Sequence, residues 1–361
     1  MGVRLKLNRF RVFDSIIIKI KLLAMKNQNH LKSIVLSIVC ILIAVPVTLV
    51  SVELALRLKN LSMKNYEIEM WRYARELKTL SQDPTLGHIH RPSASALLQS
   101  VEIRTNELGL RGPSIPAAKG LPTILFLGSS ITLGWGVPEA DTVVAQTQKL
   151  LKKDGIEAVV LNAGVGNYNS QRYVNLFLSK LKQIEPTDIV VHFFLRDAEI
   201  LEAPRSNWFL KNSQLAVTLW NLYQQSAMAK KGVTVESKYR EIYNYNHPGY
   251  QEMVAALTKL SVYAQSHNIR AYLAVTPDVH NLKQYPFSFI HEEMGRLSKK
   301  LGYHFVDLYP SLQGLTPEQV WSMPGDPHPN SLGHLKMAEA IVPVLEKEIT
   351  SSNHTNRKNI N

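Results

Sequence analysis

The sequence predicts an α/β domain built on a five-stranded parallel sheet, preceded by one membrane-spanning helix. Three observations support this prediction: five short apolar runs, helix-like segments between them, and one long apolar run near the N-terminus. Strands buried on both faces read as continuous apolar runs, and their alternation with amphipathic helices is typical of a parallel sheet covered on both sides. At 361 residues the chain is long enough to bury a full-sized core.

Residues 1–32 form a basic segment, with eight Lys or Arg against the single acid Asp14. Residues 33–56 are then apolar over the length that crosses a bilayer, with Glu53 as the exception. This run is longer than the apolar core of a signal peptide and lacks a clear small-residue cleavage site, so we expect an uncleaved membrane anchor. The positive-inside rule then keeps residues 1–32 cytoplasmic and predicts a single-pass inner-membrane protein whose remaining chain is periplasmic or extracellular.

Charge and cysteine content exclude several classes of protein. The net charge of +12 is concentrated in the first 32 residues, and no basic stripe with interleaved aromatics follows, so we expect no nucleic-acid partner. The only cysteine, Cys40, lies inside the apolar run, which excludes structural disulfides and cysteine-bound zinc in the rest of the chain. Phosphate-loop and dinucleotide fingerprints fail on spacing, and no cluster has metal-ligand spacing. We therefore expect neither a metal nor a cofactor.

The rest of the chain divides into a stalk or connector (57–120), an α/β domain (121–350) with a helical insertion at 198–247, and a polar tail (351–361). The β-rich apolar runs predict strands at 123–128, 158–165, 188–195, 269–276 and 303–309. The segments between and after them predict helices near 139–153, 170–183, 248–267, 287–301 and 331–348.

Ligands of open α/β sheets bind beyond the carboxyl ends of the strands, so the residues that follow each strand are the most informative. These are "GSS" (128–130), "GVGNYN" (164–169), "RDAE" (196–199), "TPDVHN" (276–281) and "MPGDPHPN" (323–330). They include a serine after the first strand and an acid and a histidine after the last.

Ser130, His328 and Asp326 have the chemistry of a nucleophile, a base and an orienting carboxylate. A serine hydroxyl attacks only when a neighbouring base takes its proton and a third group orients that base. Asp326 precedes a proline and is biased to extended geometry, in which it and His328 point to the same side. The alternatives are a serine that caps the next helix and an aspartate that stabilises a turn.

In this order, the blocks resemble those of the SGNH, or GDSL-type, serine hydrolases. "GSSITLG" is similar to the family's Gly-Asp-Ser block, with Ser129 in place of Asp and Ser130 at the nucleophile position. "DPHPN" is similar to its final Asp-x-x-His block, with one residue fewer between Asp326 and His328. The resemblance covers roughly 122–348 and implies a flavodoxin-like three-layer αβα sandwich. It also implies ester hydrolysis or acyl transfer through an acyl-enzyme, as in a membrane-anchored bacterial member.

The same resemblance implies how the oxyanion would be held. Backbone N–H groups of Ser130 and of Gly166, in "NAGVGNYN", match the family's first two donors. Arg196 stands where the family has an asparagine, and a guanidinium there either donates to the oxyanion or binds an anionic substrate group.

Three further polar residues are candidates for contact with the substrate. Asn167 adjoins Gly166, while Asp278 and His280 follow the fourth strand and either line the cleft or belong to a surface loop. All three lie in segments that follow predicted strands, where a cleft of this fold is expected.

Three functions remain open at this point. The first is a membrane-anchored serine esterase that removes an O-acyl group, such as acetyl, from an envelope polysaccharide or exopolysaccharide. The second is an O-acyltransferase that uses the same triad on a polysaccharide. The third is a non-catalytic carbohydrate-binding or assembly protein on a degenerate hydrolase scaffold, for which Arg196 and the shortened Asp–His spacing argue.

Overall fold

The computed structural model describes residues 3–116, 120–201, 208–229, 234–324, 326 and 328–358. The chain forms two compact units. One contains Met1–Leu61 with Ser213–Leu215, and the other contains Ser62–Asn212 with Ala216–Asn361. Each unit is described by itself.

The first unit is dominated by the helix α1 (Val3–Lys59). By length and composition, its segment His30–Ser62 is apolar enough to cross a membrane. The one acid in that segment, Glu53, has several partners within the unit. Its carboxylate accepts hydrogen bonds from the backbone N–H groups of Gln214 and Leu215 at 3.0 and 2.8 Å. It also forms an ion pair with Arg57 at 2.7 Å.

The second unit contains the predicted five-stranded parallel sheet, in the order β6-β5-β7-β8-β9. The strands are β5 (Thr123–Gly128), β6 (Val159–Gly164), β7 (Asp188–Phe194), β8 (Arg270–Thr276) and β9 (His304–Asp307). Every residue of β6 and β7 is buried, as expected for strands covered on both faces. The predicted fold class, a doubly wound flavodoxin-like α/β sheet, is therefore confirmed.

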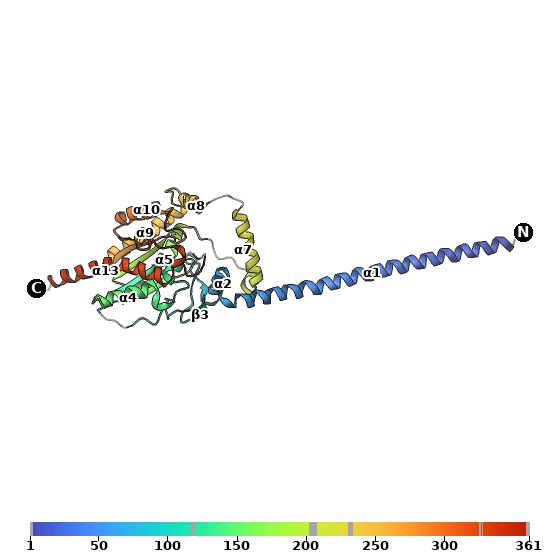
Figure 1. The fold of residues 1–361 in the computed structure, drawn as a ribbon, viewed down its shortest axis with the longest axis horizontal. Coiled ribbons are helices and arrows are strands. Elements are labelled where there is room, and N and C mark those ends of the chain that lie inside the picture. The colour runs from blue at the N-terminus through green and yellow to red at the C-terminus, as the bar shows by residue number, and fades with distance from the viewer. Residues whose placement is uncertain are drawn as a thin grey trace. The chain divides into compact units, whose positions relative to one another are not determined.

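Helices form a layer on each face of the sheet. α4 (Val143–Lys153) packs against α13 (Ser331–Lys358), and α5 (Ser170–Leu176) packs against α9 (Pro248–Ser266), which contacts α10 (Ser288–Leu301) (Figure 1). Because parallel crossovers are right-handed, the connection from β5 to β6 lies on the face opposite to those leading to β7, β8 and β9. α13 thus returns over the same face as α4, and its preceding loop reaches the end of β5.

The segment predicted as a connector belongs to the same unit as the sheet. It contains α2 (Tyr66–Glu76) and two antiparallel hairpins. The first hairpin pairs β1 (Lys78–Leu80) with β2 (His88–His90), and the second pairs β3 (Ser95–Leu98) with β4 (Val101–Arg104). Tyr73 of α2 and Leu77, the residue after this helix, are buried in a cluster with Leu133 and Trp135. Leu133 and Trp135 lie shortly after β5 in the chain. The segment is therefore packed against the sheet domain.

The remaining helices are short or belong to the insertion. Within residues 198–247, the described parts form α6 (Trp208–Asn212), α7 (Gln214–Ala229) and α8 (Val235–Ile242). The helices α3 (Ser130–Leu133), α11 (Tyr309–Leu312) and α12 (Pro317–Val320) each form a single turn. α3 begins directly after β5, and so it carries the predicted nucleophile.

A buried ion pair joins the amino ends of β7 and β8, opposite the edge where the site lies. Asp188 is fully buried, and its two carboxylate oxygens accept hydrogen bonds from Arg270 Nε at 2.7 Å and Nη2 at 2.6 Å. The hydroxyl groups of Tyr272 and Thr187 donate two more hydrogen bonds, at 3.0 and 2.7 Å. Removal of one partner of such a pair leaves an uncompensated buried charge.

We expect Arg270→Met to lower the free energy of unfolding by about 3 kcal/mol, because Asp188 would lose the guanidinium but keep the tyrosine hydroxyl. Lys336→Met is the matched control. It breaks an exposed pair with Glu339 and should cost less than about 0.5 kcal/mol. Urea unfolding of the full chain in detergent measures both, and equal losses would contradict a structural role for the buried pair.

Candidate active site

Ser130 is held by close contact between α3 and the ends of two strands. A Cβ atom on Gly128 would lie 2.7 Å from the His192 carbonyl oxygen, and one on Gly164 would lie 2.2 Å from the backbone nitrogen of Leu133. Neither position accepts a side chain, so both need glycine for this approach. These two glycines, at the ends of β5 and β6, thus set the position of Ser130 at the carboxyl edge of the sheet.

His328 meets Ser130 across a separation of 198 residues in the chain. Its Nε2 atom lies 2.7 Å from Ser130 Oγ, which is hydrogen-bond distance. The loop is tied locally, since the Ser322 N–H donates to the His328 carbonyl at 2.9 Å. His328 is only 5% exposed, so its ring is held in the wall of the site. The structure thus brings the predicted nucleophile and base together.

Asp326 accepts four hydrogen bonds. Its Oδ1 accepts from the His328 backbone N–H at 2.9 Å and from His328 Nδ1 at 2.5 Å. Its Oδ2 accepts from Ser322 Oγ at 3.0 Å and from Gln99 Nε2 at 3.3 Å. The spacing between Asp326 and His328 is one residue shorter than in the serine hydrolases that the sequence resembles. It still allows both hydrogen bonds between these two residues.

The protonation state of this pair follows from its contacts. Burial raises the pKa of Asp326, but its hydrogen bonds with His328, the charge of that ring and the Gln99 amide outweigh burial and hold the pKa below the usual value. An ionised carboxylate accepts only, so His328 Nδ1 carries the proton. Nε2 faces the hydroxyl of Ser130 and accepts its hydrogen bond when the ring is neutral.

Ser130 and His328 line a hollow of about 50 Å³, which we call the active-site hollow. It lies at the carboxyl edge of the sheet, where the loops after β5, β6 and β7 converge. The other residues that line it are Tyr66, Met70, Ser129, Ile131, Asn167, Tyr168, Phe194, Arg196, Glu199 and Leu201. Two of these, Tyr66 and Met70, come from α2.

Gly166 differs from its predicted role. Its backbone N–H donates to the Tyr73 hydroxyl at 2.8 Å, so this N–H is not available to an oxyanion. Its neighbour Asn167 lines the active-site hollow instead, in the left-handed backbone conformation with φ of 63°. The Asn167 backbone N–H forms no hydrogen bond with any described residue. The available donor is thus one residue further along the chain than predicted.

Arg196 lines the active-site hollow as predicted from its place after β7. It lies in the short helix η5 (Leu195–Ala198), and its Nη2 pairs with Glu199 at 3.2 Å. Glu199 also lines the hollow and accepts hydrogen bonds from Lys238 and from the Tyr239 hydroxyl. The guanidinium is therefore positioned by a carboxylate that several groups hold in place.

Asp278 and His280 do not line the active-site hollow. They bind each other, with His280 Nδ1 2.9 Å from Asp278 Oδ1. The His280 ring packs against Trp321 at a centroid distance of 6.0 Å. The surface-loop alternative for these two residues agrees with these contacts, since each satisfies the other outside the hollow.

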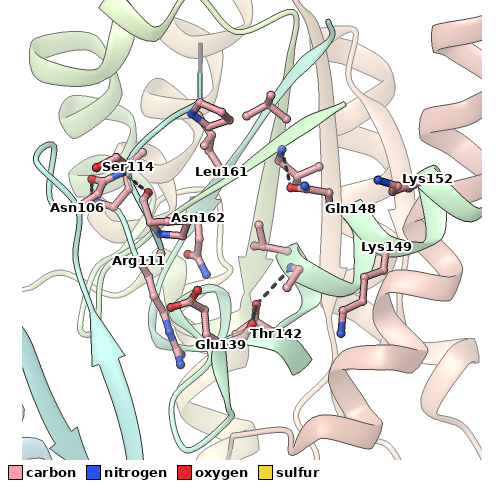
Figure 2. Close-up of a pocket in the computed structure, with 18 residues that line it drawn as sticks. Asn106, Arg111, Ser114, Glu139, Thr142, Gln148, Lys149, Lys152, Leu161 and Asn162 are labelled. Atoms are coloured by element: carbon pink, nitrogen blue, oxygen red, sulfur yellow. Dashed lines mark hydrogen bonds between the residues drawn. The ribbon is translucent and has the colours of Figure 1, made fainter. Parts of the chain in front are cut away.

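A larger hollow, of about 350 Å³, lies along the outer edge of β6 (Figure 2). The Arg111 backbone N–H donates to the Asn162 carbonyl there, and Gln148 Oε1 accepts from the Val160 N–H. The residues that line it include no serine beside a histidine, so the triad identifies the smaller hollow as the candidate active site.

Sequence reasoning missed the contribution of the segment before β5. Gln99 holds Asp326, and the Tyr66 ring lies 5.9 Å from that of His328. One signal was present: Tyr66, Met70, Tyr73 and Leu77 recur at the spacing of one face of a helix. This spacing indicates a helix that packs against a core.

No protein-family model matches the sequence, and no curated protein matches it. The fold is similar to solved esterase structures. The acetylxylan esterase Axe2 from Geobacillus stearothermophilus is 17% identical, with 62% of this chain and 93% of that chain covered and a TM-score of 0.41. A two-domain esterase active on acetylated mannans is 18% identical over 63% and 49% of the two chains, with a TM-score of 0.41.

A protein from Desulfitobacterium hafniense, assigned to the G-D-S-L lipolytic family, is 16% identical over 62% of this chain and 98% of that chain, with a TM-score of 0.38. Similarities this distant do not identify an activity or a substrate. The function must be argued from the residues of the active-site hollow.

Proposed function

We propose that this protein is a serine esterase that cleaves a short O-acyl ester with Ser130 as the nucleophile. The observation that carries the proposal is the hydrogen-bonded series from Ser130 Oγ to His328 to Asp326, with distances of 2.7 and 2.5 Å. This arrangement supplies the activated nucleophile, the base and its orienting group that acyl transfer needs. It argues against the non-catalytic alternative, which does not require these three groups to be aligned.

In the acylation step, Ser130 Oγ bonds to the ester carbonyl carbon while His328 Nε2 takes the hydroxyl proton. The tetrahedral intermediate collapses as His328 returns that proton to the departing alcohol. A water molecule, deprotonated by the same nitrogen, then attacks the acyl-serine. The bond to Ser130 Oγ breaks as His328 returns the proton to this oxygen, and the acid is released. The Asp326 carboxylate stabilises the imidazolium that forms in both steps.

We assign the oxyanion to two backbone donors, the N–H groups of Ser130 and Asn167. Ser130 is the first residue of α3, and the first N–H groups of a helix have no partner within it. The Asn167 N–H is likewise unengaged among the described residues, and the residue lines the hollow. Arg196 stands where the serine hydrolases that the sequence resembles have an asparagine, and it adds positive charge at the wall of the hollow.

The size of the hollow favours a short acyl group. About 50 Å³ is enough for an acetyl-sized group and is smaller than a fatty acyl chain. The apolar segment of α1 would anchor the protein, and the basic residues in the earlier part of this helix would keep the N-terminus cytoplasmic. The substrate would then be an O-acetylated polysaccharide of the bacterial envelope or exterior.

We expect Ser130→Ala and Asp326→Asn each to lower kcat for p-nitrophenyl acetate by about 10⁴-fold or more, with little change in KM. The first variant lacks the nucleophile, and the second no longer holds His328 in the reactive tautomer. Ser179→Ala is the matched control, since Ser179 is an exposed serine in η3 (Phe177–Leu181), the helical turn that follows α5. Full activity in Ser130→Ala would refute the assignment.

The acyl preference is a separate prediction. We expect kcat/KM for p-nitrophenyl acetate to exceed that for the octanoate ester by at least about 10-fold, because the longer chain exceeds the volume of the hollow. A preference for octanoate would contradict the proposed substrate class. With an acyl-labelled donor and a glycan acceptor, we expect free acid as the product, and labelled glycan would assign acyl transfer instead.

A further inference from the structure

Two side chains of the first hairpin bind the Gly166 carbonyl from the side away from the active-site hollow. Lys78 Nζ, on β1, lies 3.2 Å from the Gly166 oxygen, and His88 Nε2, on β2, lies 3.0 Å from it. Lys78 and His88 are both buried, and neither lines the hollow. These contacts therefore act on the oxyanion loop from the side away from the substrate.

The same peptide unit contains the Gly166 carbonyl and the Asn167 N–H. In a trans peptide these two groups point in opposite directions, and the described residues include no cis peptide bond. A group that binds the carbonyl from behind therefore aims the N–H away from itself. For this loop, that direction leads from the hairpin toward the hollow that Asn167 lines.

We propose that Lys78 is a positioning residue, whose ammonium group orients and polarises the Gly166–Asn167 peptide so that the Asn167 N–H becomes a stronger donor to the oxyanion. The proposal rests on the esterase function proposed above for its catalytic consequence. The orientation and polarisation of the peptide do not depend on that function.

The environment of Lys78 makes this effect large. A hydrogen bond from a charged donor is stronger than one between neutral groups, and in a buried site it polarises the accepting amide further. Among the described residues, no carboxylate forms an ion pair with Lys78, so its charge is not compensated locally. Its hydrogen-bond acceptor is the Gly166 carbonyl, because His88 Nε2, 3.3 Å away, donates to the same carbonyl and presents no lone pair to Lys78.

The charge of Lys78 changes near neutral pH. Burial, and next the charge of Arg172 from α5, lower the pKa of Lys78 to about 7. The other groups that face it stay neutral there: the Tyr73 ring lies 4.5 Å away, and burial lowers the pKa of His88 to about 3 and that of His90 to about 4. Lys78 is therefore charged below about pH 7, and the polarisation of the peptide is lost as the pH rises through that value.

Tyr73 provides a matched control because it binds the other side of Gly166. Its hydroxyl accepts from the Gly166 N–H and lies 2.6 Å from His90 Nε2, while His90 Nδ1 lies 2.9 Å from the Gly109 carbonyl. The Gly166 N–H belongs to the preceding peptide unit, not to the one that contains the Asn167 N–H. Tyr73→Phe keeps the ring beside Lys78 but removes this contact.

The sequence allows the peptide to be observed directly, because 166–167 is the only Gly-Asn pair in the chain. The full chain, labelled with carbonyl-¹³C glycine and ¹⁵N asparagine in detergent micelles, gives one HNCO signal. We expect this signal to shift with a midpoint near pH 7 in the wild type and in Tyr73→Phe. We expect no such titration in Lys78→Met, which has no ammonium, or in Lys78→Arg, whose charge is permanent.

Either lysine variant is sufficient if the other fails to fold. Both variants retain His328, so any contribution of that ring to the HNCO shift is the same in them as in the wild type. A signal that does not move in the wild type, or that titrates equally in the lysine variants, would overturn the proposal. This readout needs no enzymatic activity. A wild type that shows the titration but hydrolyses no ester would refute the proposed function and leave the peptide polarisation standing.

The kinetic consequence is measured with p-nitrophenyl acetate. We expect Lys78→Met to lower kcat roughly 10-fold with KM within about twofold, less than the 10²–10³-fold cost of losing an oxyanion donor altogether. Lys78→Arg should restore most of kcat and remove the decline in kcat above about pH 7. Equal kcat and identical pH profiles in the wild type and both variants would contradict a positioning role.

Discussion

The candidate active site depends on one hydrogen bond, between Ser130 Oγ and His328 Nε2. The two residues come from the first and last loops of the sheet domain, so the bond exists only because α13 returns over the face that carries α4. That return places the loop before α13 above the end of β5. The acid that holds the histidine arrives in the same loop, and the catalytic series is therefore a direct consequence of strand order.

Much of this arrangement could be predicted from the sequence. The five apolar runs predicted the strands closely, because strands buried on both faces have few polar interruptions. The strand-end rule then located Ser130, and the extended geometry before a proline predicted that Asp326 and His328 share a side. Both predictions rest on local features of the chain, and the contacts in the structure agree with them.

The parts that could not be predicted depend on contacts between distant segments. Whether Gly166 or Asn167 presents its N–H to the hollow depends on Tyr73, 93 residues earlier, which occupies the Gly166 N–H. Likewise, Asp278 and His280 follow a strand as a site residue would, but they bind each other outside the hollow. The residues before β5 were predicted as a connector because short hairpins leave no strong periodic pattern in the sequence. Only α2 has such a pattern, in the apolar residues along one of its faces.

The most direct test of the central claim is the covalent reaction of Ser130 with a fluorophosphonate, followed by peptide mapping of the full chain by mass spectrometry. The account predicts one adduct, on Ser130, that forms readily in the wild type and far more slowly in His328→Ala, because the histidine accepts the hydroxyl proton. An adduct on another serine, or labelling of Ser130 that does not depend on His328, would contradict it.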